Sequence, residues 1–487
     1  MPARSLDLGL IAVYLITVTV FGARFRHKQK SLKDYFLGGR EAPWWAISLS
    51  IVAAETSTLT IVGTPALAFD GNLGFLQLVF GYLVARVVIS VLFIPQYFRG
   101  QMFTAYELMQ RRFGERVRRF AASTFLLTRS LAEGVRVFAI SLVVSVVLGT
   151  GEVESIIIIS LLTLFYTFEG GMTAVIWTDV VQMALYVSGA ILSFVLILGH
   201  ISGGWAEVAA VAARDAKFQV FDFGFEPSMA FFSRTYTFWA GLLGGCFLVT
   251  ATHGTDQLMV QRLLSARSQR DSRLALFASW FVILLQFSLF LMIGVMLYVF
   301  YQQSGLPAPE PRDRLYPAFV WDYLPPVASG LVVAAILAAA MSNLSAALNS
   351  LASSTVMDLY LPLFRRDKLS DRQALTLSRA ATFVWGVVLV TFALMARKWG
   401  PVLEAGLAIA SVPLGALLGV FCLGVLTERV KENAAIGAMI CGFAVIGFVT
   451  LYTTIAWTWY VVIGATTTFA AGCLLSLIPA APVEANR

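Results

Sequence analysis

The chain is a succession of long apolar runs separated by short polar breaks. A helix that crosses a bilayer needs about 20 apolar residues, and most of the runs reach that length. The pattern therefore predicts an all-α polytopic membrane protein with about 13 transmembrane helices. The expected helices cover residues 7–23, 44–69, 73–96, 120–149, 152–169, 173–200, 230–253, 274–301, 327–356, 376–396, 401–425, 433–452 and 455–478.

Basic residues gather on alternate breaks. One set of breaks holds 21 Lys and Arg residues and the other set holds 8. Because cytoplasmic loops are enriched in Lys and Arg, the basic set is expected in the cytoplasm. The N-terminus is then outside and the C-terminus cytoplasmic, which requires an odd number of crossings. The basic set is 24–40, 97–119, 262–273 and 365–379, and the other set is 1–6, 201–234, 302–326 and 397–398.

The composition excludes several classes of protein. Of the 487 residues, 58% are hydrophobic and only 13% are charged, and the mean hydropathy is +0.79. Because soluble domains have about 25% charged residues, this chain is not an ordinary soluble enzyme, a disordered chain or a nucleic-acid-binding protein. The net charge of +7 is interpreted as a topology signal. Its four cysteines lie in apolar runs without CxxC or CxxH spacing, so neither disulfides nor a zinc site are predicted.

Several ionisable residues fall inside the expected spans, where a charge costs about 2.5–3.5 kcal/mol. Each is therefore a candidate functional residue. Arg129, Glu133 and Arg136 share one helix face, because Glu133 is four residues after Arg129 and Arg136 is three residues after Glu133. The spacing favours mutual neutralisation, with a cavity role for at least one arginine as the alternative. The other ionisable residues inside or at the ends of spans are Glu55, Arg86, Asp179, His253 and Asp256.

Glu55 begins a polar run in the middle of a span, 55–60 (ETSTLT), with no opposite charge near it in the sequence. The hydroxyl groups could bond to helix carbonyls. The run also fits a helix that breaks and lines a cavity, where freed carbonyls bind a cation. Because Gly63-Thr64-Pro65 adds a local breaker, we favour the broken helix.

A stripe of small and polar residues follows i, i+3 and i+4 spacing along 327–356. Such residues often allow close helix packing. Sodium, however, is a hard cation that prefers hydroxyl, amide, carboxylate and carbonyl oxygens. A hydroxyl stripe, an unwound segment and a buried carboxylate together offer that chemistry. The stripe consists of Ala339, Ser342, Ser345, Ala346, Asn349 and Ser353, with Asn343 beside it.

Asp179 lies near the expected cytoplasmic start of the span 173–200. Its carboxylate caps the helix or faces water, or else it belongs to an internal ion site. The sequence pattern leaves both interpretations open.

At these residues the chain resembles the sodium:solute symporter family, which includes sodium-coupled transporters of sugars, proline, sialic acid, monocarboxylates, vitamins and iodide. The resemblance runs in consistent order from about residue 7 to about residue 430, and its motifs are specific only in combination. They are 34–40 (DYFLGGR), Tyr106-Glu107-Leu108 with Arg112-Phe113-Gly114, Gly170-Gly171 through Gln182, Asp256-Gln257 through Arg262, and Met341 to Asp358-Leu359-Tyr360.

The resemblance implies a LeuT-type core of ten helices in two inverted five-helix repeats. The first repeat would cover 44–200 and the second 230–425. An N-terminal helix with a basic cytoplasmic linker, 1–43, precedes them, and an extracytoplasmic loop, 201–229, joins them. Two peripheral helices and a short tail, 426–487, follow.

The family's shared sodium site lies between its first and eighth core helices. Carried over, its ligands would be the carbonyl groups of Ala53, Thr56 and Ala339 and the side chains of Ser342 and Asn343. Asn343 departs from the Ser or Thr that is usual there, although its amide oxygen can still bind a cation.

Some family members carry a second sodium site, which Asp179, Ser342 and Ser345 would form here. Ala346 stands where those members have a hydroxyl group, so one ligand is lost. Glu55 occupies the place of an Asp that matters for sodium in proline-type members.

The resemblance says less about the solute. Sugar-type members bind hydroxyl groups with Gln and Glu where this chain has Leu59, Thr60 and Val79, which argues against a sugar. A sialic-acid member binds a carboxylate with an Arg, and Arg129 or Arg136 would do so here. We therefore expect a carboxylate-bearing solute: a monocarboxylate, amino acid, vitamin or sialic-acid-like molecule. The residues assigned to substrate binding or coupling are Glu55, Ser57, Thr60, Arg129, Glu133, Arg136, Asp256 and Gln257.

The expected function is sodium-coupled secondary active symport by alternating access. Na⁺ is the coupling ion, and no organic cofactor, nucleic acid or catalytic residue is expected, because no GxSxG, HExxH or paired-Asp pattern lies at bilayer depth. A monomer in the plasma (inner) membrane is expected. The alternatives are a sodium/sugar symporter and a proton-coupled transporter that uses Glu55.

Overall fold

The structure is a computed structural model that describes residues 2–23, 36–99, 102–167, 171–364, 371–400 and 402–478. Within these residues the secondary structure is helical, apart from one isolated bridge between Ala42 and Ala266. Several parts of the sequence analysis fall outside the described residues. They are most of the basic linker (24–35), Gly170, 365–370 and most of the tail (479–487).

Twenty-one α-helices and seven shorter 3₁₀ or π segments are described in these parts of the chain. The α-helices are α1 (Pro2–Ala23), α3 (Trp44–Glu55), α4 (Thr64–Asp70), α5 (Leu76–Val88), α6 (Ile94–Tyr97), α7 (Tyr106–Arg112), α8 (Glu115–Leu148), α9 (Glu152–Thr167), α10 (Gly171–His200), α11 (Gly204–Arg214), α12 (Met229–Ser233), α13 (Gly245–Gly254), α14 (Gln257–Leu264), α15 (Gln269–Ser304), α16 (Leu315–Tyr323), α17 (Ala328–Ser354), α18 (Leu361–Phe364), α19 (Asp371–Ala396), α20 (Val402–Leu426), α21 (Glu432–Tyr452) and α22 (Tyr460–Leu475). The π segments are η3 (Leu59–Gly63), η4 (Ile89–Phe93), η5 (Ala240–Gly244) and η7 (Thr355–Tyr360), and the 3₁₀ segments are η2 (Gly38–Arg40), η6 (Arg312–Arg314) and η8 (Trp457–Trp459).

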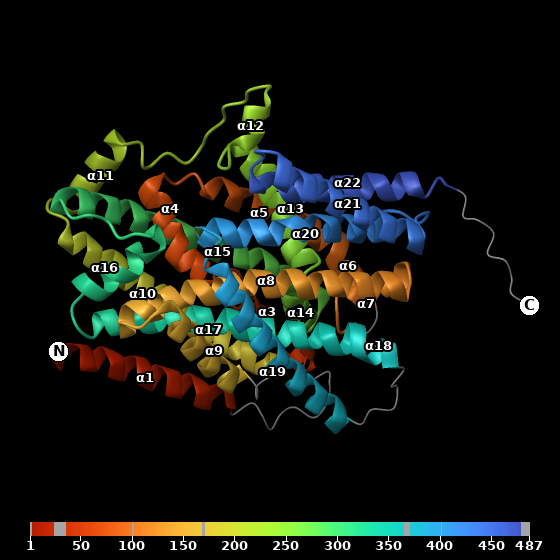
Figure 1. The fold of residues 1–487 in the computed structure, drawn as a ribbon, viewed down its shortest axis with the longest axis horizontal. Coiled ribbons are helices and arrows are strands. Elements are labelled where there is room, and N and C mark those ends of the chain that lie inside the picture. Colours follow the sequence, from red (N-terminus) through yellow and green to blue (C-terminus); the bar gives the residue numbers. More distant parts are fainter. Residues whose placement is uncertain are drawn as a thin grey trace, which may run out of the picture.

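Every apolar run contains a helix. Among the described residues nine helices are long and apolar enough to cross a membrane, and the bent pair α3 and η3–α4 adds a tenth. The helices α1, α9 and η5–α13 occupy the remaining expected spans. In Figure 1 most long helices lie along one axis, with the start of α1 at one end and the end of α22 at the other.

The structure differs most from the expectations in the two long connections and at the start of one span. The long connections 201–229 and 302–326 contain the helices α11 and α16, because a polar connection can still be amphipathic: α11 buries Val208 and Val211. The span expected from residue 230 begins only at Ala240, because Ser233 ends the short helix α12 and the chain is extended at Arg234.

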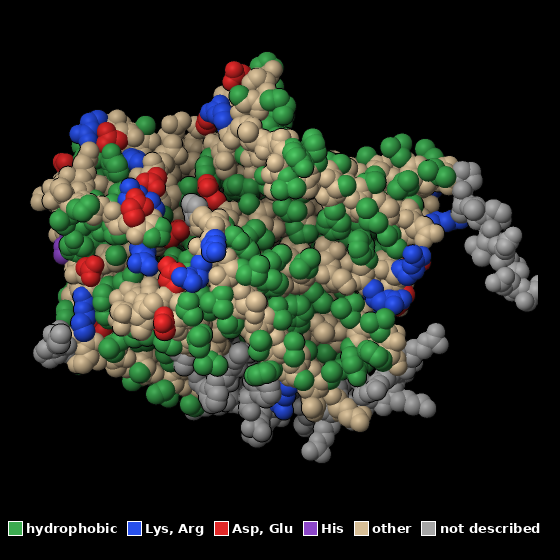
Figure 2. Space-filling view, in the orientation of Figure 1, with side chains coloured by type: hydrophobic (Ala, Val, Ile, Leu, Met, Phe, Trp, Pro, Cys, Tyr) green, Lys and Arg blue, Asp and Glu red, His purple; other side chains and the backbone are tan. Residues whose placement is uncertain are grey.

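Helix α17 lies in the interior, and 94% of the residues in its most apolar part are buried. Its many Ala and Ser side chains allow α10, α8 and α1 to approach closely. In Figure 2 charged side chains gather toward the two ends of the long axis, whereas hydrophobic side chains cover most of the middle. The arrangement is that of a multi-pass membrane protein around one central helix.

Candidate functional site

The first span is an interrupted helix. Helix α3 ends at Glu55, Thr56 is extended (φ −83°, ψ 98°), and the chain bends by 60° before it continues as η3 and α4. Thr56, Ser57 and Thr58 are buried, so the backbone groups freed by the break lie inside the protein and not against lipid. The broken helix that the polar run predicted is confirmed.

Glu55 has a partner that the local sequence does not reveal. Its Oε2 accepts a hydrogen bond from Arg86 Nη2 at 3.0 Å and lies 3.2 Å from His253 Nε2. Arg86 is fully buried and also donates to the carbonyl oxygen of Leu276 at 3.1 Å and to the hydroxyl of Ser279 at 3.3 Å. Because Arg86 is 31 residues away on α5, only the fold brings the two charges together.

A cavity of about 110 Å³, which we call the central cavity, lies among the break, α8, the end of α13 and α20. Most of its wall is apolar and includes the aromatic side chains of Phe75, Phe125 and Phe287. A mostly apolar wall with a few convergent polar groups is typical of a small-molecule site. The residues assigned to substrate binding or coupling that line it are Glu55, Ser57, Thr60, Arg129, Arg136 and Asp256.

Four charges form one set beside this cavity. Arg129 Nη2 lies 2.8 Å from Glu133 Oε1, and Arg136 Nη1 donates to the same oxygen. Arg129 Nη1 also lies 3.5 Å from Asp256 Oδ2. The neutralisation favoured by the spacing is confirmed, with Asp256 as a further member. Two arginines face two carboxylates, so the set is formally neutral, while the Nε atoms of Arg129 and Arg136 have no hydrogen-bond partner among the described residues.

A second interruption separates α13 from α14. Asp256 is extended and its Oδ1 accepts the backbone N–H of Leu258 at 2.8 Å, which caps α14. Gln257 does not line the central cavity. Its Oε1 accepts the N–H of Ala105 at 2.8 Å and its Nε2 donates to the carbonyl of Phe103 at 3.1 Å, so it joins α14 to the segment before α7.

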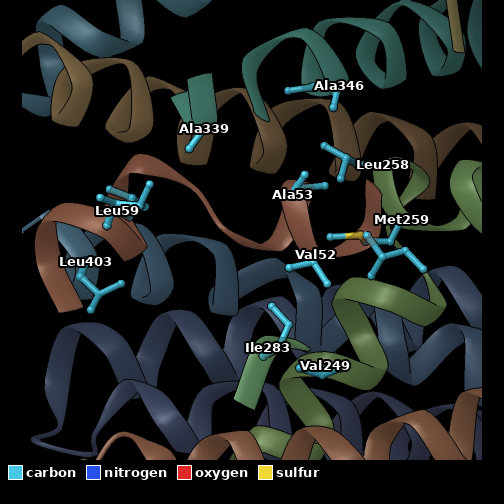
Figure 3. Close-up of a cluster of buried hydrophobic side chains, with 14 of the residues drawn as sticks. Val52, Ala53, Leu59, Val249, Leu258, Met259, Ile283, Ala339, Ala346 and Leu403 are labelled. Atoms are coloured by element: carbon cyan, nitrogen blue, oxygen red, sulfur yellow. The ribbon is translucent and has the colours of Figure 1, made fainter. Parts of the chain in front are cut away.

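The backbone positions expected for the shared sodium site are all in the interior. Ala53, Thr56 and Ala339 are buried. In Figure 3, Ala53 lies where α3 leads into the extended segment toward Leu59, and Ala339 lies on a neighbouring helix. The hydroxyl of Thr56 accepts Gln286 Nε2 at 2.6 Å, so this side chain already has a protein partner.

The side chains of the same expected site lie on α17. Asn343 Nδ2 donates to the carbonyl oxygen of Ala54 at 2.5 Å, and within the described part of the chain Asn343 Oδ1 has no hydrogen-bond partner. The hydroxyl of Ser342 donates to Asp179 Oδ1. The crossing of α3 and α17 is therefore fixed by an amide nitrogen, and the amide oxygen is left for another ligand.

Asp179 is fully buried, so its interpretation as a water-facing helix cap is wrong. It accepts hydrogen bonds from Ser50 Oγ at 2.5 Å, Arg262 Nη2 at 2.9 Å and the hydroxyl of Ser342. Arg262, placed above with the cytoplasmic basic residues, is buried as the counter-ion of Asp179. Ser345 turns its hydroxyl to the carbonyl of Ser342 at 3.0 Å and not to Asp179.

A larger second cavity of about 570 Å³ lies beside η6 and the start of α20 and is lined by many charged side chains. Leu403 lines both this cavity and the central cavity. A Cβ on Gly63 would lie only 2.6 Å from Leu403 Cβ, and one on Gly406 only 2.5 Å from Leu59 Cδ1. A thin, tightly packed apolar seam between η3 and α20 therefore separates the two cavities.

Comparison with known proteins gives consistent matches. The model of the sodium:solute symporter family matches residues 35–442. The chain is 29% identical to the human (Homo sapiens) sodium/iodide cotransporter over 92% of this chain and 70% of that protein. It is 29% identical to the Bos taurus sodium-coupled monocarboxylate transporter 2 over 88% and 70%, and 30% identical to a putative sodium-dependent multivitamin transporter of Drosophila melanogaster over 90% and 73%.

Solved structures extend the match to the fold. A Na⁺-coupled sialic acid symporter in a substrate-bound outward-open state aligns with a TM-score of 0.87 and 26% identity, over 97% of this chain and 98% of that chain. The nucleobase-cation-symport-1 transporter Mhp1 in a closed conformation shares the fold alone, with a TM-score of 0.53 and 12% identity over 91% and 93%. Because the family model spans most of the chain, the chain belongs to the sodium:solute symporter family, whose members are transporters and not enzymes and whose coupling ion is Na⁺.

Proposed function

We propose that this protein is a sodium-coupled secondary active symporter that imports a small carboxylate-bearing solute by alternating access. One observation carries the proposal: the interrupted helix α3–α4 crosses the hydroxyl-bearing helix α17 beside a central cavity lined by two arginines. The crossing offers oxygen ligands to Na⁺ from Ala53, Thr56, Ala339 and Ser342. Asn343 belongs to the same set through its free amide oxygen.

The charge balance of the central cavity favours an anionic solute. Arg129 and Arg136 are matched by Glu133 and Asp256, so the four charges sum to zero. A bound Na⁺ gives the cavity a net positive charge, and a bound anion returns that net charge to zero. Each ligand therefore favours binding of the other. The two unpartnered Nε donors offer hydrogen bonds to a carboxylate. The relatives named for iodide and monocarboxylates carry anions, which supports the same class.

The cavity also limits size. A volume of about 110 Å³ suits a monocarboxylate or small amino acid better than a sialic-acid-like molecule. Leu59 and Thr60 offer one hydroxyl between them, which is a poor match to the many hydroxyl groups of a sugar. The sodium/sugar alternative is therefore weaker than the carboxylate proposal.

The energetics depend on stoichiometry. One Na⁺ carried with a neutral solute releases about 2.3 kcal/mol per 100 mV. A tenfold gradient adds about 1.4 kcal/mol, and the total supports roughly 500-fold accumulation. A monoanion cancels the charge of one Na⁺, which leaves only the gradient and about tenfold accumulation. With two Na⁺ the total is about 5 kcal/mol and accumulation reaches several thousand-fold.

The finer architecture belongs to the proposal. We place 13 spans in the plasma (inner) membrane, with the N-terminus outside and the C-terminus cytoplasmic, and we expect a monomer. The opposite positions of the start of α1 and the end of α22 support an odd number of crossings (Figure 1). The repeats would be 44–200 and 230–425, between the segments 1–43, 201–229 and 426–487. Each repeat contains one interrupted helix near its start, which supports the inverted pair.

Two alternatives remain within the transporter class. A second Na⁺ at Asp179, Ser342 and Ser345 would have to displace or share the charge of Arg262. Proton coupling through Glu55 is favoured by its contact with His253, because a carboxylate and an imidazole can exchange a proton.

The class of solute is tested by thermal unfolding of the purified protein with candidate solutes, in Na⁺ and in K⁺ at equal ionic strength. A substrate stabilises the folded protein by binding to it, and sodium coupling makes that stabilisation larger in Na⁺ than in K⁺. Lactate, proline, glucose and sialic acid represent the competing classes. Stabilisation by a monocarboxylate or amino acid in Na⁺ supports the proposal. Equal stabilisation in Na⁺ and K⁺ that varies with pH favours proton coupling.

A further inference from the structure

A small cavity of about 10 Å³ lies next to the central cavity, between the broken helix, α8 and α17. Its volume is close to that of one water-sized sphere, so it has room for one water or one small ion. Ser57 and Arg136 line both cavities, so an ion in the central cavity would reach the small cavity past these two side chains.

Four oxygen atoms without a protein partner belong to residues that line this small cavity. Glu133 and Asn343 are 0% and 1% exposed, and their atoms Oε2 and Oδ1 accept no hydrogen bond from any residue that the structure describes. The hydroxyl groups of Ser57 and Thr58 form no hydrogen bond with the described residues, although both side chains are buried. An unpaired buried acceptor destabilises the folded state, so an occupant shared by Glu133 Oε2 and Asn343 Oδ1 would stabilise both groups.

The bonding of the same residues explains why these oxygens remain free. Glu133 uses Oε1 for Arg129 and Arg136, which leaves Oε2 for the cavity. Asn343 uses its amide nitrogen for Ala54, which leaves its oxygen. The free side-chain atoms of both residues are acceptors, which a cation binds directly. Arg136 also lines the cavity, but its charge is matched by Glu133, and Asp256 matches that of Arg129.

We propose that the small cavity binds one Na⁺ through Glu133 Oε2, the hydroxyl groups of Ser57 and Thr58, and Asn343 Oδ1, and that this amide oxygen bridges to the Na⁺ at the shared site. The proposal rests on the proposed sodium-coupled function. It places the added charge between the break in the first span and the arginines that face the central cavity. Two Na⁺ with one monoanion move one net positive charge per cycle, so transport of the solute would be driven by the membrane potential.

The test is the dependence of thermal stability on sodium concentration, measured on the purified full-length protein with choline replacing Na⁺ at constant ionic strength. The increase of unfolding free energy with the logarithm of the Na⁺ concentration counts the ions that bind only to the folded state. Thr58→Val removes one ligand and keeps the shape of the side chain. Thr64→Val is the matched control, because Thr64 is buried, has an unpartnered hydroxyl and does not line the small cavity.

We expect the wild-type protein and Thr64→Val to bind one more Na⁺ than Thr58→Val and Glu133→Gln over the same concentration range. If Glu133→Gln fails to fold because two arginines lose their partner, Thr58→Val alone decides. A wild-type sodium dependence in both Thr58→Val and Ser57→Ala would overturn the proposal and leave water as the occupant. That result leaves the shared site untouched, whereas wild-type protein with no sodium dependence would overturn the proposed function itself.

Discussion

The buried pair of Glu55 and Arg86 gives the most demanding prediction for stability. Glu55→Gln removes the carboxylate charge 3.0 Å from a guanidinium that is fully buried. Coulomb's law gives about 5.5 kcal/mol for this distance at an effective dielectric constant of about 20. Breaking a buried pair in proteins costs about 3–5 kcal/mol, because the remaining charge is uncompensated. We expect Glu55→Gln and Arg86→Met each to lower the free energy of unfolding by about 3–5 kcal/mol.

The double variant distinguishes an ion pair from two independent losses. With both charges gone, Glu55→Gln/Arg86→Met should be no less stable than either single variant, because neither charge is then left alone. The measurement is reversible denaturant unfolding in a fixed detergent, with the exposed Glu428→Gln as control. If the two single losses add within about 0.5 kcal/mol, the charges are not coupled and this account of Glu55 is refuted.

Three further predictions concern η3, the end of α4 and the segment after α11. Gly63→Ala should push η3 away from Leu403, because the new Cβ would lie 2.6 Å from Leu403 Cβ and such overpacking costs about 1–3 kcal/mol. The apolar seam between the two cavities should then open, so a cysteine introduced at Thr60 should react faster with a membrane-impermeant reagent applied from outside. An unchanged reaction rate would contradict the seam. Lys217 donates from Nζ to the carbonyls of Phe69 at 2.7 Å and Gly71 at 2.9 Å; Lys217→Met should therefore speed amide exchange in α4 by roughly tenfold or more, with Lys217→Arg as control. The hydrogen-bonded guanidinium of Arg214 lowers the pKa of Asp215 to about 2. Because the folded pKa is depressed, the stabilisation by this contact is complete above the ordinary Asp pKa and is lost only as pH falls toward 2. A carboxyl titration by NMR would check this value, and a pKa near 4 would contradict it.

The features set by local sequence were predictable. Apolar runs of span length located the helices, and the i, i+4 spacing placed Arg129 and Glu133 in contact. The break after Glu55 followed from a polar run in the middle of a span, because a helix can break at membrane depth only where it is buried in protein or lines a cavity, and polar side chains mark such a place.

The features set by distant parts of the chain were not predictable in the same way. Arg262 looked like a cytoplasmic surface residue, but it bonds Asp179, which is 83 residues away. Glu55 appeared to have no counter-ion because Arg86 is on another helix. Asn343 was expected to bind through its oxygen, and only the position of the Ala54 carbonyl shows which end of the amide is free. Burial of charge gives a signal that partners exist, but it does not say which residues they are.

The most direct test of the central claim is initial uptake of a labelled monocarboxylate into proteoliposomes that contain the purified protein. An inward Na⁺ gradient is compared with K⁺ at fixed pH and fixed membrane potential. The account predicts concentrative uptake in Na⁺, near-background uptake in K⁺, and a higher Na⁺ requirement in Ser342→Ala. Equal uptake in Na⁺ and K⁺ with the same solute would contradict sodium coupling.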